Sequence, residues 1–268
     1  IAAALQARGA GAGAVVGVLC RNHRGFVELT AALAKLGATA LYLNTGFARP
    51  QLRDVLEREQ AVLVVADHEY LELVGDDRTI VADRREVDGH ETLDGFARTV
   101  GAGPRRPPPA PGRTIILTSG TTGTPKGAAR PQHAGIGSVV SMLDRIPYRE
   151  GETAVVPAPL FHSWGFGNLS LGLLLGTTFV LRPRFDPETV LADVARHRAE
   201  VLVAVPVMLQ RILDLPAEVR RRYDTSSLRI VPLSGSAIPG DLATRWMDEF
   251  GDTIYNLYGS TEVGWATI

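Results

Sequence analysis

Short runs of apolar, often β-branched residues alternate along this chain with longer stretches in which apolar positions recur at helical spacing. The run at 14–20 has the composition of a buried parallel strand. A helical pattern follows at 23–35, and Gly37 stands where that helix would end. Pro50 suits the first turn of a further helix over 50–59. Other strand-like runs in this half lie at 39–43, 61–66 and 114–117.

The same alternation continues through the second half of the chain. We predict helices over 132–143, 163–175, 187–197, 206–213 and 239–250, and strands over 153–156, 177–181, 201–205, 228–233 and 253–256. Asp186 is suited to cap the helix that begins at 187. Strands that alternate with helices indicate an α/β fold in which mainly parallel sheets carry helices on both faces. Ligands of such folds gather at the carboxyl ends of the strands.

The length of 268 residues suffices for about two domains. A connector at 102–112 contains five prolines and no periodicity, and a more charged break follows at 148–152. By composition alone the connector would be the domain boundary. We place the boundary at the second break, which predicts a first α/β subdomain over 1–148 and a second over 149–268.

Composition excludes several classes of protein. Hydrophobic residues make up 45% and charged residues 21% of the chain, as in soluble globular proteins. A net charge of −1 gives no basic face for nucleic acid, and no apolar window is long enough to span a membrane. Cys20 is the single cysteine, so a disulfide within the chain is excluded and a cytoplasmic location is expected. We expect Cys20 to be a small buried residue at the end of a strand.

The ten residues 118–127, TSGTTGTPKG, follow the strand-like run at 114–117. The glycines permit a tight turn whose free N–H groups form a concave anion site, beside five hydroxyls and the ammonium of Lys126. A surface loop is the alternative. The chain otherwise uses arginine for nearly all of its positive charge, so a lysine kept here indicates a need for a compact ammonium. The loop predicts phosphate binding, although it lacks the Walker A pattern.

Three further segments begin where strand signals end. One places His162 between aromatic residues, where the alternative is a structural histidine. The second, at 233–237, has small residues that let a flat ligand approach the backbone, and a plain tight turn is the alternative. The third, at 255–262, ends on Glu262; a carboxylate near phosphate requires a cation such as Mg²⁺, unless the segment is an exposed turn.

Together these segments resemble the signatures of the adenylate-forming superfamily, which includes acyl-CoA synthetases, aryl-CoA ligases, luciferases and amino-acid adenylation domains. Residues 118–127 resemble its phosphate loop, and YGSTE at 258–262 is similar to its Y-G-x-T-E signature. The resemblance implies a layered αβαβα domain of two doubly wound subdomains. It also implies an acid–thiol ligase that converts a carboxylic acid and ATP to an acyl-adenylate, from which a thiol, usually that of coenzyme A, displaces AMP.

The resemblance assigns roles residue by residue. Thr118 and Glu262 would hold Mg²⁺, Thr261 would contact the α-phosphate, and Lys126 would act on the phosphates together with the loop. His162 would lie near the substrate carboxylate, and Trp164 would line or gate the acyl tunnel. The residues implied to bind the β- and γ-phosphates are Ser119, Gly120, Thr121, Thr122, Gly123 and Lys126, and those implied to bracket the adenine are Ser236, Ala237, Asn256, Leu257 and Tyr258.

The residues around His162 bear on the class of acid. Residues 157–185 contain no Asp or Glu to pair a buried substrate ammonium, and leucines are frequent from Leu169 to Leu175. We therefore expect a hydrophobic acid, in the first place a fatty acid, and leave acyl chain length, aryl preference and oligomeric state, including a homodimer, open.

Family members usually continue beyond the residue that matches Ile268 with a ribose-binding aspartate and a small C-terminal domain that carries a catalytic lysine. We expect this chain to be the large N-terminal domain without that part, with little activity of its own. An amino-acid or aryl-acid adenylation domain, and a nucleotide-binding module without activity, are the alternatives.

Overall fold

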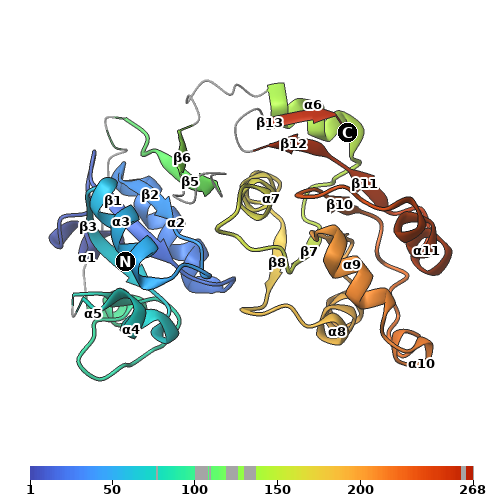
Figure 1. Cartoon of the computed structure of the whole chain (residues 1–268), viewed down its shortest axis with the longest axis horizontal. Helices are drawn as coiled ribbons and strands as arrows, with labels where there is room; N and C mark the ends of the chain where they lie inside the picture. Colours follow the sequence, from blue (N-terminus) through green and yellow to red (C-terminus); the bar gives the residue numbers. More distant parts are fainter. Residues whose placement is uncertain are drawn as a thin grey trace. The chain divides into compact units, whose positions relative to one another are not determined.

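The computed structural model describes residues 1–76, 78–99, 108, 110–118, 126–129, 137–260 and 264–267, with the backbone alone at 99, 118, 126–129, 137–139, 260 and 264–266. The chain divides into two compact units, Ile1–Gln132 and His133–Ile268, which we call the first and the second unit (Figure 1). The predicted subdomain boundary at 148/149 differs from this division, because helix α6 (Gly137–Arg145) falls in the second unit. The boundary of the functional subdomains stays a prediction.

The first unit is built on a six-stranded sheet with the strand order β4-β3-β1-β2-β5-β6. All neighbouring pairs are parallel except β5 and β6, which are antiparallel. The strands are β1 (Val15–Leu19), β2 (Thr39–Tyr42), β3 (Ala61–Ala66), β4 (Ile80–Val81), β5 (Thr114–Thr118) and β6 (Lys126–Ala129). The helices are α1 (Ala2–Ala7), α2 (Arg24–Leu36), α3 (Arg49–Arg58), η1 (His68–Tyr70), α4 (Leu71–Val74) and α5 (Leu93–Thr99).

Helix α2 shows why the sequence folds this way locally. The His23 side chain caps its first turn by accepting a hydrogen bond from the Gly25 N–H. At the other end Gly37 takes φ = +68°, which glycine adopts without a Cβ penalty, and its N–H bonds the last turn. The apolar stripe faces the sheet, where the Phe26 ring stacks on that of Tyr42 at a centroid distance of 5.2 Å. The predicted helix and its end at Gly37 are confirmed.

The second unit repeats the same design. Strands β8-β7-β9 form one parallel sheet and β10-β11 another, and parallel bridges from Val201 to Ile230 and from Ala204 to Leu233 join β9 to β10. The strands are β7 (Thr153–Val156), β8 (Thr178–Leu181), β9 (Val201–Leu202), β10 (Val231–Leu233), β11 (Ile254–Asn256), β12 (Tyr258–Ser260) and β13 (Gly264–Thr267). The helices after α6 are α7 (Ser163–Leu174), α8 (Pro187–His197), α9 (Pro206–Leu213), α10 (Ala217–Arg220) and α11 (Gly240–Phe250).

The core of the second unit lies between its helices and the five parallel strands. Trp246 of α11 is fully buried there and donates its indole N–H to the Thr253 hydroxyl at 3.0 Å. Asp186 caps α8 as predicted, accepting the Thr189 N–H at 2.8 Å. The predicted α/β class with mainly parallel sheets is confirmed. The antiparallel pair β12–β13 was not predicted: β12 pairs with a strand that follows it in the chain.

Candidate functional site

The carboxyl ends of the parallel strands in the second unit lie along one edge of its sheet, and the chain reverses its winding there. From β7 the chain passes through α7 to β8 on one side, whereas from β9 it passes through α9 and α10 to β10 on the other. Strands β7 and β9 are direct neighbours, and Ala158 beyond β7 donates its N–H to the Val203 carbonyl beyond β9 at 3.2 Å. The crevice of an open α/β sheet at which ligands bind lies at such a switch point.

His162 stands at this switch point, at the N-cap of α7. The side chain retains solvent-exposed surface, yet its ring lies 4.4 Å from that of Phe161, between centroids, and partial burial lowers the pKa of the imidazole below its usual value. Desolvation disfavours the charged form of histidine. His162 is therefore an accessible imidazole whose pKa lies below the usual value of a histidine.

Trp164, which was predicted to line or gate an acyl tunnel, follows His162 in the first turn of α7. Its side chain is buried, and its indole N–H donates to the Ala204 carbonyl at 2.8 Å. Gly165 lets this turn of α7 approach the preceding loop, because a Cβ at Gly165 would lie 2.7 Å from the Pro159 carbonyl carbon and closer still to its oxygen. The role of Trp164 toward an acyl group stays a prediction.

The two segments predicted to bracket adenine are brought together by strand pairing. Leu233 of β10 lies opposite Asn256 of β11 in a parallel register, so the residues that follow β10 adjoin the end of β11. Ser236, Ala237, Asn256 and Tyr258 are exposed there, and Tyr258 keeps 72% of its surface. The Leu257 side chain is buried, so only its backbone could contact a ligand at this edge. The arrangement leaves an aromatic ring and small residues open to a flat ligand.

The described residues include only the two ends of the predicted phosphate loop. Thr118, the last residue of β5, lies opposite Lys126, the first residue of β6, so the two ends of the loop are held side by side. The residues predicted to bind phosphate between them (Ser119, Gly120, Thr121, Thr122 and Gly123) lie outside the described residues, as do Thr261 and Glu262. The Mg²⁺ site predicted from Thr118 and Glu262 therefore stays a prediction.

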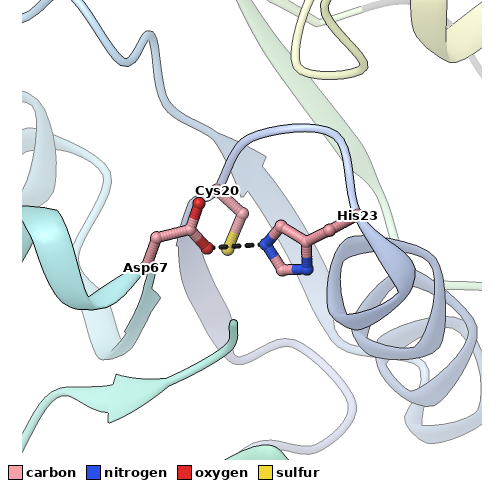
Figure 2. A group of neighbouring side chains, drawn as sticks. All are labelled: Cys20, His23 and Asp67. Atoms are coloured by element: carbon pink, nitrogen blue, oxygen red, sulfur yellow. Dashed lines mark hydrogen bonds and ion pairs between the residues drawn. The ribbon is translucent and has the colours of Figure 1, made fainter. Parts of the chain in front are cut away.

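Sequence reasoning missed a cluster at the corresponding switch point of the first unit, between the ends of β1 and β3. Figure 2 shows Cys20, His23 and Asp67 pointing toward one another, with one ligand atom of each within 4.8 Å of the others. These residue types can bind Zn²⁺. No pattern could have found the cluster, because Asp67 lies far along the chain from Cys20 and His23.

The hydrogen bonds of this cluster are those of a closed structural network. His23 Nδ1 accepts the Gly25 N–H at 3.0 Å, so Nε2 carries the proton and donates to Asp67 Oδ1 at 2.7 Å. Asp67 Oδ2 accepts the Arg21 N–H at 2.8 Å. Burial, and after it the nearby Asp67 carboxylate, raise the pKa of the Cys20 thiol. A metal ion on Nε2 would have to replace the Nε2 proton. The ring could not move that proton to Nδ1, because Nδ1 already accepts the Gly25 N–H. This set of residues therefore does not fit a metal centre.

Comparisons with known proteins agree with the fold and the sequence signatures. The family model described as AMP-binding enzyme matches residues 1–268. A feruloyl-CoA synthase from Amycolatopsis sp is 32% identical over 98% of this chain and 52% of its own length, and an indoleacetate–CoA ligase from Aromatoleum aromaticum is 29% identical over 98% and 53%. The chain thus spans about half the length of the curated relatives it matches.

Solved structures show the same fold. An anthranilate CoA ligase in complex with anthranoyl-AMP superimposes with a TM-score of 0.86 at 24% identity, over 97% of this chain and 53% of that one. A Mycobacterium tuberculosis fatty acyl CoA synthetase gives a TM-score of 0.79 at 23% identity, over 97% and 52%. At these identities the likeness is one of fold. Among the described residues, no helix is both long and apolar enough to cross a membrane.

Proposed function

Because the chain belongs to the family of AMP-binding enzymes, we propose that the protein carrying it activates a carboxylic acid with ATP to an acyl-adenylate and transfers the acyl group to coenzyme A. The observation that carries this proposal is the switch-point edge of the second unit. The His162 imidazole, whose pKa is lowered by partial burial, follows β7 there, and an open aromatic and small-residue surface follows β10 and β11 along the same edge.

In this proposal, different residues of the chain bind the adenine, the phosphates and the acid. Ser236, Ala237, Asn256 and Tyr258 would hold the adenine, with the Leu257 backbone beside them. The loop from Thr118 to Lys126 would hold the phosphates, and Lys126 would offset negative charge as the carboxylate approaches the α-phosphorus. His162 would donate a hydrogen bond from its imidazole to the carboxylate of the acid. Mg²⁺, held by Thr118 and Glu262, would supply charge neutralisation when bound.

The acid we propose is hydrophobic and lacks an ammonium group. No Asp or Glu occurs in 157–185 to pair a buried ammonium, which would be costly to leave unpaired. The proposal of a fatty acid is weaker than that of a hydrophobic acid in general, because Leu169 and Leu171 of α7 are buried in the unit while Leu173 and Leu174 face outward. Two of the relatives above are named for aryl-containing acids, so aryl acids are equal candidates.

An acid panel tests the proposal. Pyrophosphate release from ATP is measured on the complete natural protein with cinnamic-type, arylacetic, medium-chain and long-chain fatty acids, and with amino acids. We expect release with at least one aryl or fatty acid and with no amino acid, and a loss of about a hundredfold or more in Lys126→Ala, typical of removing a charge that stabilises the transition state. Arg196→Ala, at an exposed position on α8, is the matched control and should keep full activity. Release with amino acids alone would contradict the proposal.

A further inference from the structure

The hydrogen bond of Trp164 joins the segments that follow β7 and β9, at the switch point of the second unit. Trp164 lies in the first turn of α7, beyond the end of β7, and its acceptor Ala204 follows β9, 40 residues along the chain. The side chain is 5% exposed, so the bond is shielded from water. A shielded hydrogen bond with good geometry fixes the two segments it joins more firmly than an exposed one.

Ala204 continues the connection to the nucleotide side of the edge. It forms a parallel bridge with Leu233, the last residue of β10, and the Leu233 carbonyl accepts the Leu257 N–H at 2.8 Å. Leu233 directly precedes the small-residue turn that contains Ser236, and Leu257 is itself one of the residues predicted to flank adenine. Trp164 is therefore joined through two backbone contacts to both predicted adenine segments.

Asn168, one turn further along α7, holds Trp164 from the other side. The Asn168 side chain is buried, its amide N–H donates to the Trp164 carbonyl at 3.0 Å, and its oxygen accepts the Tyr148 hydroxyl at 3.1 Å. A buried amide is costly unless it is hydrogen-bonded, so this chain of bonds has one favourable arrangement. With Gly165 packed closely on Pro159, α7 has little freedom to slide.

We propose that Trp164 is a positioning residue that keeps helix α7, and with it His162, in register with the strand ends that carry the adenine-binding segments. This inference rests on the proposed function for the identity of the two ligands. A misplacement of about 1 Å between reacting groups can cost about a hundredfold in rate. A side chain that merely lined an acid pocket would instead set the affinity for the acid.

Trp164→Phe separates these roles, because it keeps an aromatic ring and removes the N–H donor. We expect kcat for acid-dependent pyrophosphate release to fall by about ten- to a hundredfold, with the KM for the acid changed by less than about threefold. Tyr148→Phe should act in the same direction and more weakly. Ser170→Ala is the control, since this exposed hydroxyl on α7 bonds the Phe166 carbonyl of its own helix. A raised KM with unchanged kcat, or no change in either, overturns the proposal.

A second measurement is independent of activity. In NMR spectra of the labelled protein, Trp164→Phe should shift both the His162 imidazole resonances and the Leu233 and Leu257 amide resonances, whereas Ser170→Ala should leave them in place. If the wild-type protein releases no pyrophosphate with any acid, the proposed function fails. These spectra still test whether Trp164 holds α7 in register with the ends of β10 and β11. Unmoved His162, Leu233 and Leu257 resonances overturn the coupling whatever the activity.

Discussion

His23 joins two elements of the first unit through one ring. Its Nδ1 caps α2, and its Nε2 proton bonds Asp67 beyond β3. The capping role of His23 was not predicted, because the helical pattern of the sequence begins at His23 itself and the usual N-cap residues are Ser, Thr, Asp and Asn. The partner Asp67 was not predicted either, since it is set by the pairing of β1 with β3. At the residue scale, the cap of α8 by Asp186 was predictable from the sequence, and long-range partners were not.

Cys20 gives a test of this network through its protonation. The thiol is fully buried, and burial raises its pKa above the usual value. Below about pH 8 the thiol is protonated in the folded and the unfolded protein, and it adds no pH dependence. Above that, the unfolded chain releases the proton and the folded chain retains it, so the free energy of unfolding falls as pH rises, by at most about 1.4 kcal/mol per pH unit.

Denaturant unfolding between about pH 8.5 and 9.5 measures this slope, below the range in which unfolded tyrosines titrate. Cys20→Ala should flatten it, and only the difference in slope is informative because the smaller side chain also leaves a cavity. Iodoacetamide labelling of the wild-type protein should be much slower when folded than in urea. Equal labelling rates would show that the thiol is accessible and contradict the packing in Figure 2.

At the scale of elements, helices were predicted better than strand partners. The predicted bounds of α8 and α9 agree with the structure, because each begins with a proline in its first turn and α8 has an aspartate cap. Strands β4, β6, β12 and β13 were missed, as were the short helices α1, α4, α5 and α10. Strand β6 is held by its pairing with β5, and β12 by its pairing with β13, rather than by any apolar run of its own.

Helix α7 allows a prediction in which propensity and packing oppose each other. Gly165→Ala should gain about 1 kcal/mol of helix propensity. The added Cβ would press on the Pro159 backbone, which cannot move aside as a flexible side chain could. We expect a net loss of about 1–3 kcal/mol in the free energy of unfolding, as for overpacked sites. Gly240→Ala in α11 is the control, because a Cβ there meets open space, and a stable Gly165→Ala protein would contradict the close approach.

At the scale of the whole molecule, the sequence predicted the α/β class and the order of the four chemical segments. The division into units differs from the predicted boundary because α6 falls in the second unit, which the composition of 102–112 and 148–152 does not indicate. The sequence also did not predict which of these distant residues lie side by side, because strand pairing determines it. Leu233, which precedes the segment of Ser236, lies opposite Asn256 because β10 and β11 pair in parallel, and Trp164 bonds Ala204 because β7 and β9 are adjacent strands.

The separation of proposed phosphate-binding and adenine-binding residues between the two units gives a prediction for the whole chain. Lys126 belongs to the first unit, and Ser236, Asn256 and Tyr258 to the second. Adenosine should therefore slow amide hydrogen exchange near β10 and β11 alone, whereas Mg·ATP should also slow it at β5 and β6, since bound ligands stabilise the segments they contact. Lys126→Ala should weaken ATP binding and leave adenosine binding unchanged, measured by calorimetry. If adenosine and ATP protect the same amides, the loop from Thr118 to Lys126 does not bind phosphate. A nucleotide bound by that loop would slow amide exchange in β5 and β6, the strands between which the loop runs.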